Sequence, residues 1–229
     1  MFVRHPLTLL TREVPPLALS RKSLLLVQDL HAPFADPIDG FLAQRARRKI
    51  LIREFDEYFQ TLASAAPNLP RLVSMARDLR LPVAYSCLGY FAPGAPSPFQ
   101  RATGWTWELG GLDGRFPSEW APRAGEEVFA KPGWSALAGE PFVRFLRENS
   151  IESVILAGAI FEFGIRQTCL DLADRGIPCL VVADAVVALT ESGERQARGE
   201  IAHGLSKLRS TGELLQLLER VRAQETVWV

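Results

Sequence analysis

The sequence lacks several features, and their absence excludes some classes of protein. No apolar run approaches the roughly 20 residues that a membrane-spanning helix needs, and residues 1–23 lack the ordered basic, apolar and small-residue regions of a signal peptide. The 26 basic and 26 acidic side chains cancel, so no overall field attracts nucleic acid or an anionic membrane. We therefore expect a cytoplasmic protein that binds neither nucleic acid nor membranes.

Cysteine is also scarce. The three cysteines, Cys87, Cys169 and Cys179, show no close metal-ligand spacing, and an odd number cannot all pair in internal disulfides. We expect reduced thiols, no bound metal and no other cofactor.

The residues that are present are typical of a folded α/β domain. With 229 residues, of which 48% are hydrophobic and 23% charged, the chain suits a single globular domain. Apolar runs predict strands, and helical periodicity between them predicts helices on both faces of an open α/β sheet. The expected strands are residues 24–27, 82–87, 127–130, 154–157 and 179–182, and the expected helices are residues 69–81, 142–149, 165–176, 191–208 and 213–222.

Three segments do not fit a simple alternation of strands and helices. Residues 1–22 form an N-terminal arm with three prolines, which leaves residues 23–229 as one domain. Residues 32–67 contain a helical stretch from Phe41 to Ala63, and residues 89–125 are rich in glycine, proline and tryptophan. Long connections of this kind are usually lids, binding loops or oligomer contacts.

The most informative stretch begins where the strand at residues 154–157 ends. It reads GAIFEFGI from Gly158 to Ile165, continues with Thr168 and Gly176, and leads into a second strand that ends in VADA at residues 182–185. A crossover of this length joins two parallel strands, and ligands of such sheets bind at the carboxyl ends of the strands.

This stretch resembles the signature segment of the isochorismatase-like hydrolases, and the resemblance covers about residues 23–215 apart from the two long connections. It implies a three-layer αβα fold with a mostly parallel, six-stranded, Rossmann-like sheet. In most members the seventh residue of the segment is the nucleophilic cysteine, but here it is Gly164. The chain is similar in this respect to the isochorismatase branch, which uses no thiol, and the family also implies a homo-oligomer.

Two further residues carry the resemblance. Asp29 follows a buried apolar strand, where partial desolvation can raise the pKa of a carboxyl and fit it for acid-base work; by position alone it is equally well a capping aspartate. Lys131 precedes a Trp-Ser-Ala element, and by position alone it is a solvated lysine at a strand end. The resemblance identifies both as catalytic and implies an ion pair between them.

The resemblance also implies the surroundings of this pair. A cis peptide is expected between Ala159 and Ile160, and glycine at position 164 leaves space and backbone N–H groups for an anionic ligand. The expected substrate-binding residues are Ala159, Ile160, Phe161, Glu162, His31, Leu88 and Trp134.

Departures from the family pattern argue against isochorismate as the substrate. His31 stands where the first motif usually has glutamine, Leu88 where true isochorismatases have glutamine, and Ile160 where they have tyrosine. Loss of the last two polar groups removes partners of the isochorismate hydroxyl and carboxylates.

Some residues keep two interpretations. His31 is a proton shuttle near neutral pH or a structural histidine. Glu162 orients a ligand or stabilises a helix start, and together with Asp29 and His31 it forms at most a weak metal-site hypothesis. Cys87, at the end of its strand, is a minor candidate for an alternative nucleophile or is a buried thiol. Trp105 and Trp107 line a pocket or pack beneath a loop.

Two hypotheses of function follow. The first is an isochorismatase-type hydrolase that uses the Asp29 and Lys131 pair, without a thiol, on a small and anionic substrate such as an enol ether. The second is an inactive family member that binds a small ligand or serves as an oligomeric interaction protein.

Overall fold

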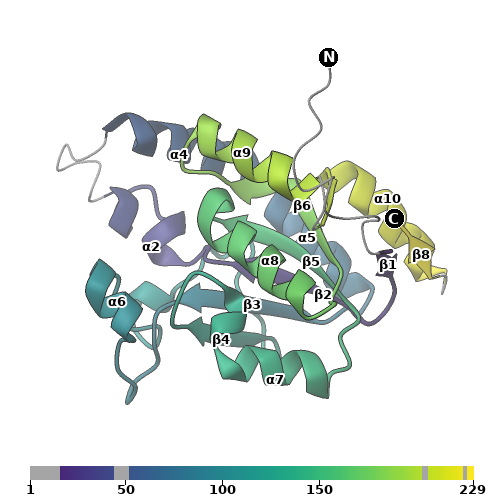
Figure 1. Cartoon of the computed structure of the whole chain (residues 1–229), viewed down its shortest axis with the longest axis horizontal. Coiled ribbons are helices and arrows are strands. Elements are labelled where there is room, and N and C mark those ends of the chain that lie inside the picture. The colour runs from purple at the N-terminus through teal and green to yellow at the C-terminus, as the bar shows by residue number, and fades with distance from the viewer. Residues whose placement is uncertain (1–15, 44–51, 203–205, 224–225) are drawn as a thin grey trace.

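The fold is built around a parallel six-stranded sheet with helices on both faces (Figure 1). The computed structural model describes residues 16–43, 52–202, 206–223 and 226–229. The strands of the main sheet are β2 (Ser23–Gln28), β3 (Val83–Leu88), β4 (Glu127–Lys131), β5 (Ser153–Ala159), β6 (Cys179–Val187) and β7 (Lys207–Arg209). The order is β4-β3-β2-β5-β6-β7, so the predicted fold class is confirmed.

The helices are α2 (Ala32–Ala35), α4 (Ile52–Ala65), α5 (Asn68–Asp78), α6 (Pro98–Thr103), α7 (Glu140–Glu148), α8 (Arg166–Asp174), α9 (Glu191–Ala202) and α10 (Thr211–Arg222). Short helical turns are η1 (Leu112–Gly114), η2 (Ala136–Ala138) and η3 (Phe161–Ile165). In the described residues, no helix is both long and apolar enough to cross a membrane.

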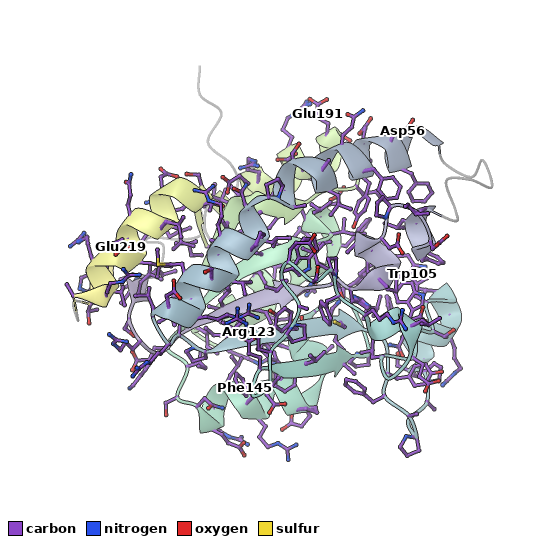
Figure 2. All side chains as sticks on the ribbon, turned by 180° about the vertical axis from the view of Figure 1, so that it is seen from behind. Asp56, Trp105, Arg123, Phe145, Glu191 and Glu219 are labelled. Atoms are coloured by element: carbon purple, nitrogen blue, oxygen red, sulfur yellow. The ribbon has the colours of Figure 1, made fainter. Side chains whose placement is uncertain are left out.

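Successive side chains of each strand point to opposite faces of the sheet, so the core has two layers. In β2, Leu25 and Val27 face the layer that also holds buried residues of α4, α5 and α10, whereas Leu24 and Leu26 face the layer beneath α7, α8 and α9. The central strands are buried along their whole length. Figure 2 shows the sheet from the side of α4, α5 and α10. A fully buried strand of this type needs apolar side chains on both faces, which explains the continuous apolar runs.

One boundary prediction requires correction. The helix expected at residues 191–208 ends at Ala202, and residues 207–209 instead form edge strand β7. Part of the expected N-terminal arm, β1 (Ala18–Leu19), pairs in antiparallel register with β8 (Val227–Trp228) in a separate two-stranded sheet. Residues 1–15 of the arm and residues 44–51 of the expected Phe41–Ala63 helix lie outside the described residues.

The two long connections pack against the sheet. Trp120 is anchored by a hydrogen bond of 3.1 Å from its Nε1 to the carbonyl oxygen of Leu30. Arg77 of α5 donates to both carboxylate oxygens of Glu126 at 2.7 and 2.8 Å. The first bond holds Trp120 near the carboxyl end of β2, and the second holds Glu126 where β4 begins.

Candidate functional site

Four strands end at the same edge of the sheet and bring the predicted site residues together. Gln28 ends β2 and is followed by Asp29, while Leu88, Lys131 and Ala159 end the neighbouring strands. Asp29 has a left-handed backbone with φ of 54°, a conformation that aspartate and asparagine tolerate better than most residues. Its N–H donates to the carbonyl of Ser86 at 2.8 Å, which holds the turn against β3.

The ion pair implied by the resemblance is present. Lys131 Nζ lies 2.7 Å from Asp29 Oδ2, and the two side chains are only 0% and 3% exposed. Asp29 Oδ1 accepts a hydrogen bond of 2.7 Å from the N–H of Leu88. Lys131 Nζ also donates to the carbonyls of Gly133 and Trp134, at 3.1 and 2.7 Å. These three contacts use all three donors of an ammonium group.

The Asp29 carboxyl has a raised pKa. Burial is the largest cause, because desolvation disfavours the charged form; Lys131, through its charge and its hydrogen bond, and the N–H of Leu88 act in the opposite direction. A raised pKa favours the protonated carboxylic acid, which is the form that a general acid needs.

The signature segment lies directly beside this pair. The Ala159–Ile160 peptide is cis, as expected, and the chain continues through the π-helical turn η3 into α8. A Cβ atom added to Gly164 would lie 3.3 Å from Asp29 Oδ2 and 2.5 Å from Gln28 Nε2. The space beside Gly164 is therefore already occupied by the Gln28 amide, contrary to the expectation of an open position.

Gln28 was missed by reasoning from the sequence. Its Oε1 accepts a hydrogen bond of 2.8 Å from Thr168 Oγ1, and Thr168 in turn accepts one of 3.0 Å from the N–H of Ala136. Gln28 thus connects β2, α8 and the loop after β4 at the point where Gly164 lies. The available signal was a glutamine at the end of an otherwise apolar buried strand.

Comparisons with known proteins agree with this geometry. Residues 23–213 match the family model for the isochorismatase domain. The chain belongs to the isochorismatase family. Similar solved structures include a cysteine hydrolase from Pseudomonas syringae pv. phaseolicola 1448A, which is 14% identical with a TM-score of 0.69, covering 88% of this chain and 94% of that chain. An isochorismatase family protein from Desulfovibrio vulgaris is 20% identical with a TM-score of 0.66, covering 89% and 100%.

An amidase is also among the structures that resemble this isochorismatase-family chain. The N-carbamoylsarcosine amidase from Thermoplasma acidophilum is 23% identical with a TM-score of 0.62, and the match covers 82% of this chain and 96% of that one. At these identities the likeness concerns the fold alone.

Glu162 joins two loops of the isochorismatase-family domain. Its Oε1 and Oε2 accept hydrogen bonds from the N–H of Leu189 at 3.1 and 3.0 Å, and its Oε1 accepts one from the N–H of Thr190 at 2.9 Å. The carboxylate therefore binds the backbone just before α9 and ties η3 to the β6–α9 loop. Among the described residues, no group of three His, Cys, Asp or Glu side chains is arranged to hold a metal.

His31 is a buried, neutral histidine. Its Nε2 lies 3.3 Å from the carbonyl oxygen of Leu88, and its ring packs against Phe34, Trp107 and Phe116. Burial lowers the pKa of His31 to about 3. A histidine with this pKa does not shuttle protons near neutral pH, so that expectation does not hold.

This lowered pKa predicts a specific acid sensitivity. The unfolded chain binds a proton on His31 near pH 6.5, whereas the folded chain does so only near pH 3. His31 therefore contributes stability above pH 6.5 that is lost as the pH falls toward 3. Urea unfolding at a series of pH values should show a flatter acid limb for His31→Gln than for the unaltered protein. Parallel curves would contradict this assignment.

The other predicted residues at this end of the sheet are buried. Leu88 and Phe161 are fully buried, and Ile160 is 3% exposed. Phe161 belongs to the core layer beneath α8 and α9, with Arg198 over its ring. Cys87 is buried, and burial, together with the charge of Asp29, raises the pKa of its thiol well above the usual value. Such a thiol stays protonated, which does not favour a nucleophile.

Aromatic rings cover the outer side of the site. Phe163 stacks on Trp134 with ring centroids 5.0 Å apart, and Trp134 meets Trp105 edge to face at 4.9 Å. Trp105 continues the series to Trp107 at 5.8 Å, and Figure 2 shows Trp105 near α2 and α6. Trp105 and Trp107 therefore pack beneath the 89–125 connection, as one interpretation predicted. Trp107 also lines a hollow, as the other predicted.

The close approach of Gln28 to Gly164 gives a prediction for this position. Gly164→Ala places a Cβ 2.5 Å from Gln28 Nε2 and should destabilise the fold by about 1–3 kcal/mol, as overpacking does. In the Gln28→Ala background the same change should cost much less. Urea unfolding of the four variants measures the coupling. Equal costs in both backgrounds would show that the amide is not the obstacle. Gly176→Ala is a comparison variant. Its added Cβ meets nothing within 4 Å, so any cost there comes from the positive φ of Gly176 and not from a clash.

Proposed function

We propose that this chain is a thiol-independent hydrolase of the isochorismatase family that cleaves a small, anionic enol ether. The observation that carries the proposal is the desolvated Asp29 carboxyl, held by Lys131 beside a position that has no side chain to serve as a nucleophile. Gly164 groups the chain with the non-thiol branch of the family. An acid with a raised pKa suits proton transfer to carbon better than attack on an acyl group.

The reaction requires one proton and one water molecule. Asp29 donates its proton to the terminal carbon of the C=C bond, and the electrons of that bond leave an oxocarbenium ion stabilised by the ether oxygen. Water adds to this cation, and the hemiketal collapses to an alcohol and a ketone. The proton released by water returns to Asp29, so the enzyme is unchanged.

Lys131 acts through Asp29 in this scheme. Its three donors are engaged by Asp29 and by two backbone carbonyls, so it has none left for a substrate carboxylate. Its charge opposes the rise in the pKa of Asp29 that burial produces, and this balance keeps the acid able both to lose and to regain its proton. Lys131 therefore does not bind the substrate in this proposal.

The choice of bond class is tested by hydrolysis in D₂O. A panel of small carboxylate-bearing enol ethers, amides and esters is incubated with the protein, and products are analysed by NMR. Turnover of an enol ether with one deuterium in the new methyl group is the expected result, because the proton goes to carbon. Hydrolysis of amides or esters alone would contradict the proposal.

The burial of the pair favours a second candidate function. Asp29 and Lys131 are 3% and 0% exposed as side chains, and Leu88 and Ile160 are buried as well. A family member that binds a ligand without turning it over would have such a site. Saturable binding of a panel compound without product would support this second function over the first.

A further inference from the structure

A hollow outside the Asp29 site has the size of a small-molecule site. Its volume is about 890 Å³, and it lies between α2 and the part of the 89–125 connection from Trp107 to Trp120. This is within the range of about 300–1,000 Å³ that ligand sites occupy. Asp29, Lys131 and Gly164 do not line it, so it is separate from the proposed reaction.

Aromatic rings form part of its wall. Phe41, Trp107, Phe116 and Trp120 all line the hollow. Trp120 is fixed by its hydrogen bond to Leu30, and Trp107 packs edge to face on Phe41 with ring centroids 5.2 Å apart. Fixed aromatic faces attract cations through the ring quadrupole.

The polar side chains of the wall are mainly acidic. Four carboxyl side chains and one guanidinium line the hollow: Asp36, Asp39, Asp113 and Glu119 against Arg115. In the part of the chain that the structure describes, Asp36, Asp113 and Glu119 form no ion pair with a basic side chain. Even without Asp39, the carboxylates of Asp36, Asp113 and Glu119 outnumber the single guanidinium of Arg115, and this balance favours a cationic ligand.

An unsatisfied acceptor lies directly behind the aromatic wall. His31 is fully buried, and its Nδ1 has no hydrogen-bond partner. The His31 ring meets Trp107 and Phe116, two residues of the wall, each with centroids 6.2 Å apart. Because His31 does not itself line the hollow, it supports the inner side of the wall and is not a ligand contact.

We propose that this hollow is a second binding site, which takes a small organic cation. The aromatic side chains and the carboxylates of the wall bind the cation. The proposal does not depend on the reaction assigned to Asp29.

Choline is a suitable probe, because it is a small organic cation with a quaternary ammonium group. 3,3-Dimethylbutan-1-ol is its uncharged isostere. Titration of the full chain, followed by calorimetry and tryptophan fluorescence, should show saturable choline binding and at least about tenfold weaker binding of the isostere, as the loss of a cation–π contact predicts. Equal affinity for both compounds, or no saturable choline binding, would overturn the proposal.

Charge variants locate the site. Asp113→Asn combined with Glu119→Gln should weaken choline binding severalfold. Glu119 is exposed and Asp113 is half-buried, and thermal unfolding checks that the double variant is folded. Glu148→Gln, an exposed change on α7, is the matched control and should bind as the unaltered protein does. Unchanged binding in the double variant would place choline elsewhere and refute the assignment.

Two further variants separate this site from the Asp29 site and test the wall. Asp29→Asn should bind choline normally; loss of binding there would show that choline occupies the reaction site instead. Phe116→Leu, at a half-buried wall position, should weaken choline binding more than binding of the isostere. An equal loss for both compounds would remove the aromatic part of the proposal.

Discussion

Turnover of an enol-ether substrate should fall about 10²–10⁴-fold when Asp29 is replaced by asparagine, which is the usual contribution of a general acid. Asparagine keeps the size of the side chain and tolerates the left-handed backbone at this position, but its amide has no acidic proton to give. Steady-state kcat/KM from pH 4 to 9 measures the effect. The variant should also lose the pH dependence that comes from the carboxyl.

Cys87→Ala is the matched control for this prediction. Cys87 is buried next to the site, and its raised thiol pKa keeps it protonated. Its removal should therefore leave kcat/KM near that of the unaltered protein, provided that thermal unfolding shows the variant to be folded. An inactive Cys87→Ala beside an active Asp29→Asn would reverse the assignment of the two residues.

The second large effect concerns stability. Lys131→Met removes one partner of a buried ion pair and leaves the Asp29 carboxylate, as well as the carbonyls of Gly133 and Trp134, without their donor. We expect a loss of about 3–5 kcal/mol in the free energy of unfolding, the usual cost of breaking a buried pair. Urea unfolding at pH 7 measures it.

A double-mutant cycle gives the control for Lys131. Adding Asp29→Asn to Lys131→Met removes the unpaired charge, so the double variant should be more stable than the sum of the two single losses implies. Additive losses would show that the two side chains contribute independently, although they lie 2.7 Å apart. Lys22→Met, which breaks an exposed ion pair with Glu152, should cost no more than about 1 kcal/mol.

The main features of the fold were predictable because continuous apolar runs have few alternatives. Residues 154–157 and 179–182 each lie within a strand of the sheet, and the helix between them packs one side of it. The end of α9 was not predictable: polar residues continue the helical pattern past Ala202, whereas the chain turns into edge strand β7. At an edge, backbone pairing with β6 outweighs the local helical preference.

The site was predictable only in part. The positions of Asp29 and Lys131 follow from strand ends at one edge of the sheet, together with the family resemblance. The Gln28 amide beside Gly164 and the carboxylate of Glu162 on the α9 loop depend on side-chain directions in three dimensions. Burial of His31 depends on Trp107 and Phe116, which the distant 89–125 connection supplies. Local sequence patterns do not predict such packing between distant segments.

The strand order has a consequence for folding. β2 and β5 are adjacent in the centre of the sheet, with Ser23 opposite Ser153, although most of the domain lies between them in the sequence. Pairing distant segments costs loop-closure entropy before their contacts stabilise the chain, so parallel sheets of this type fold slowly. The Asp29–Lys131 pair and the Gly164 turn come from strands on both sides of this central contact. Partly synthesised chains that end before β5 therefore lack the signature segment, and the site is completed only when β5 docks beside β2.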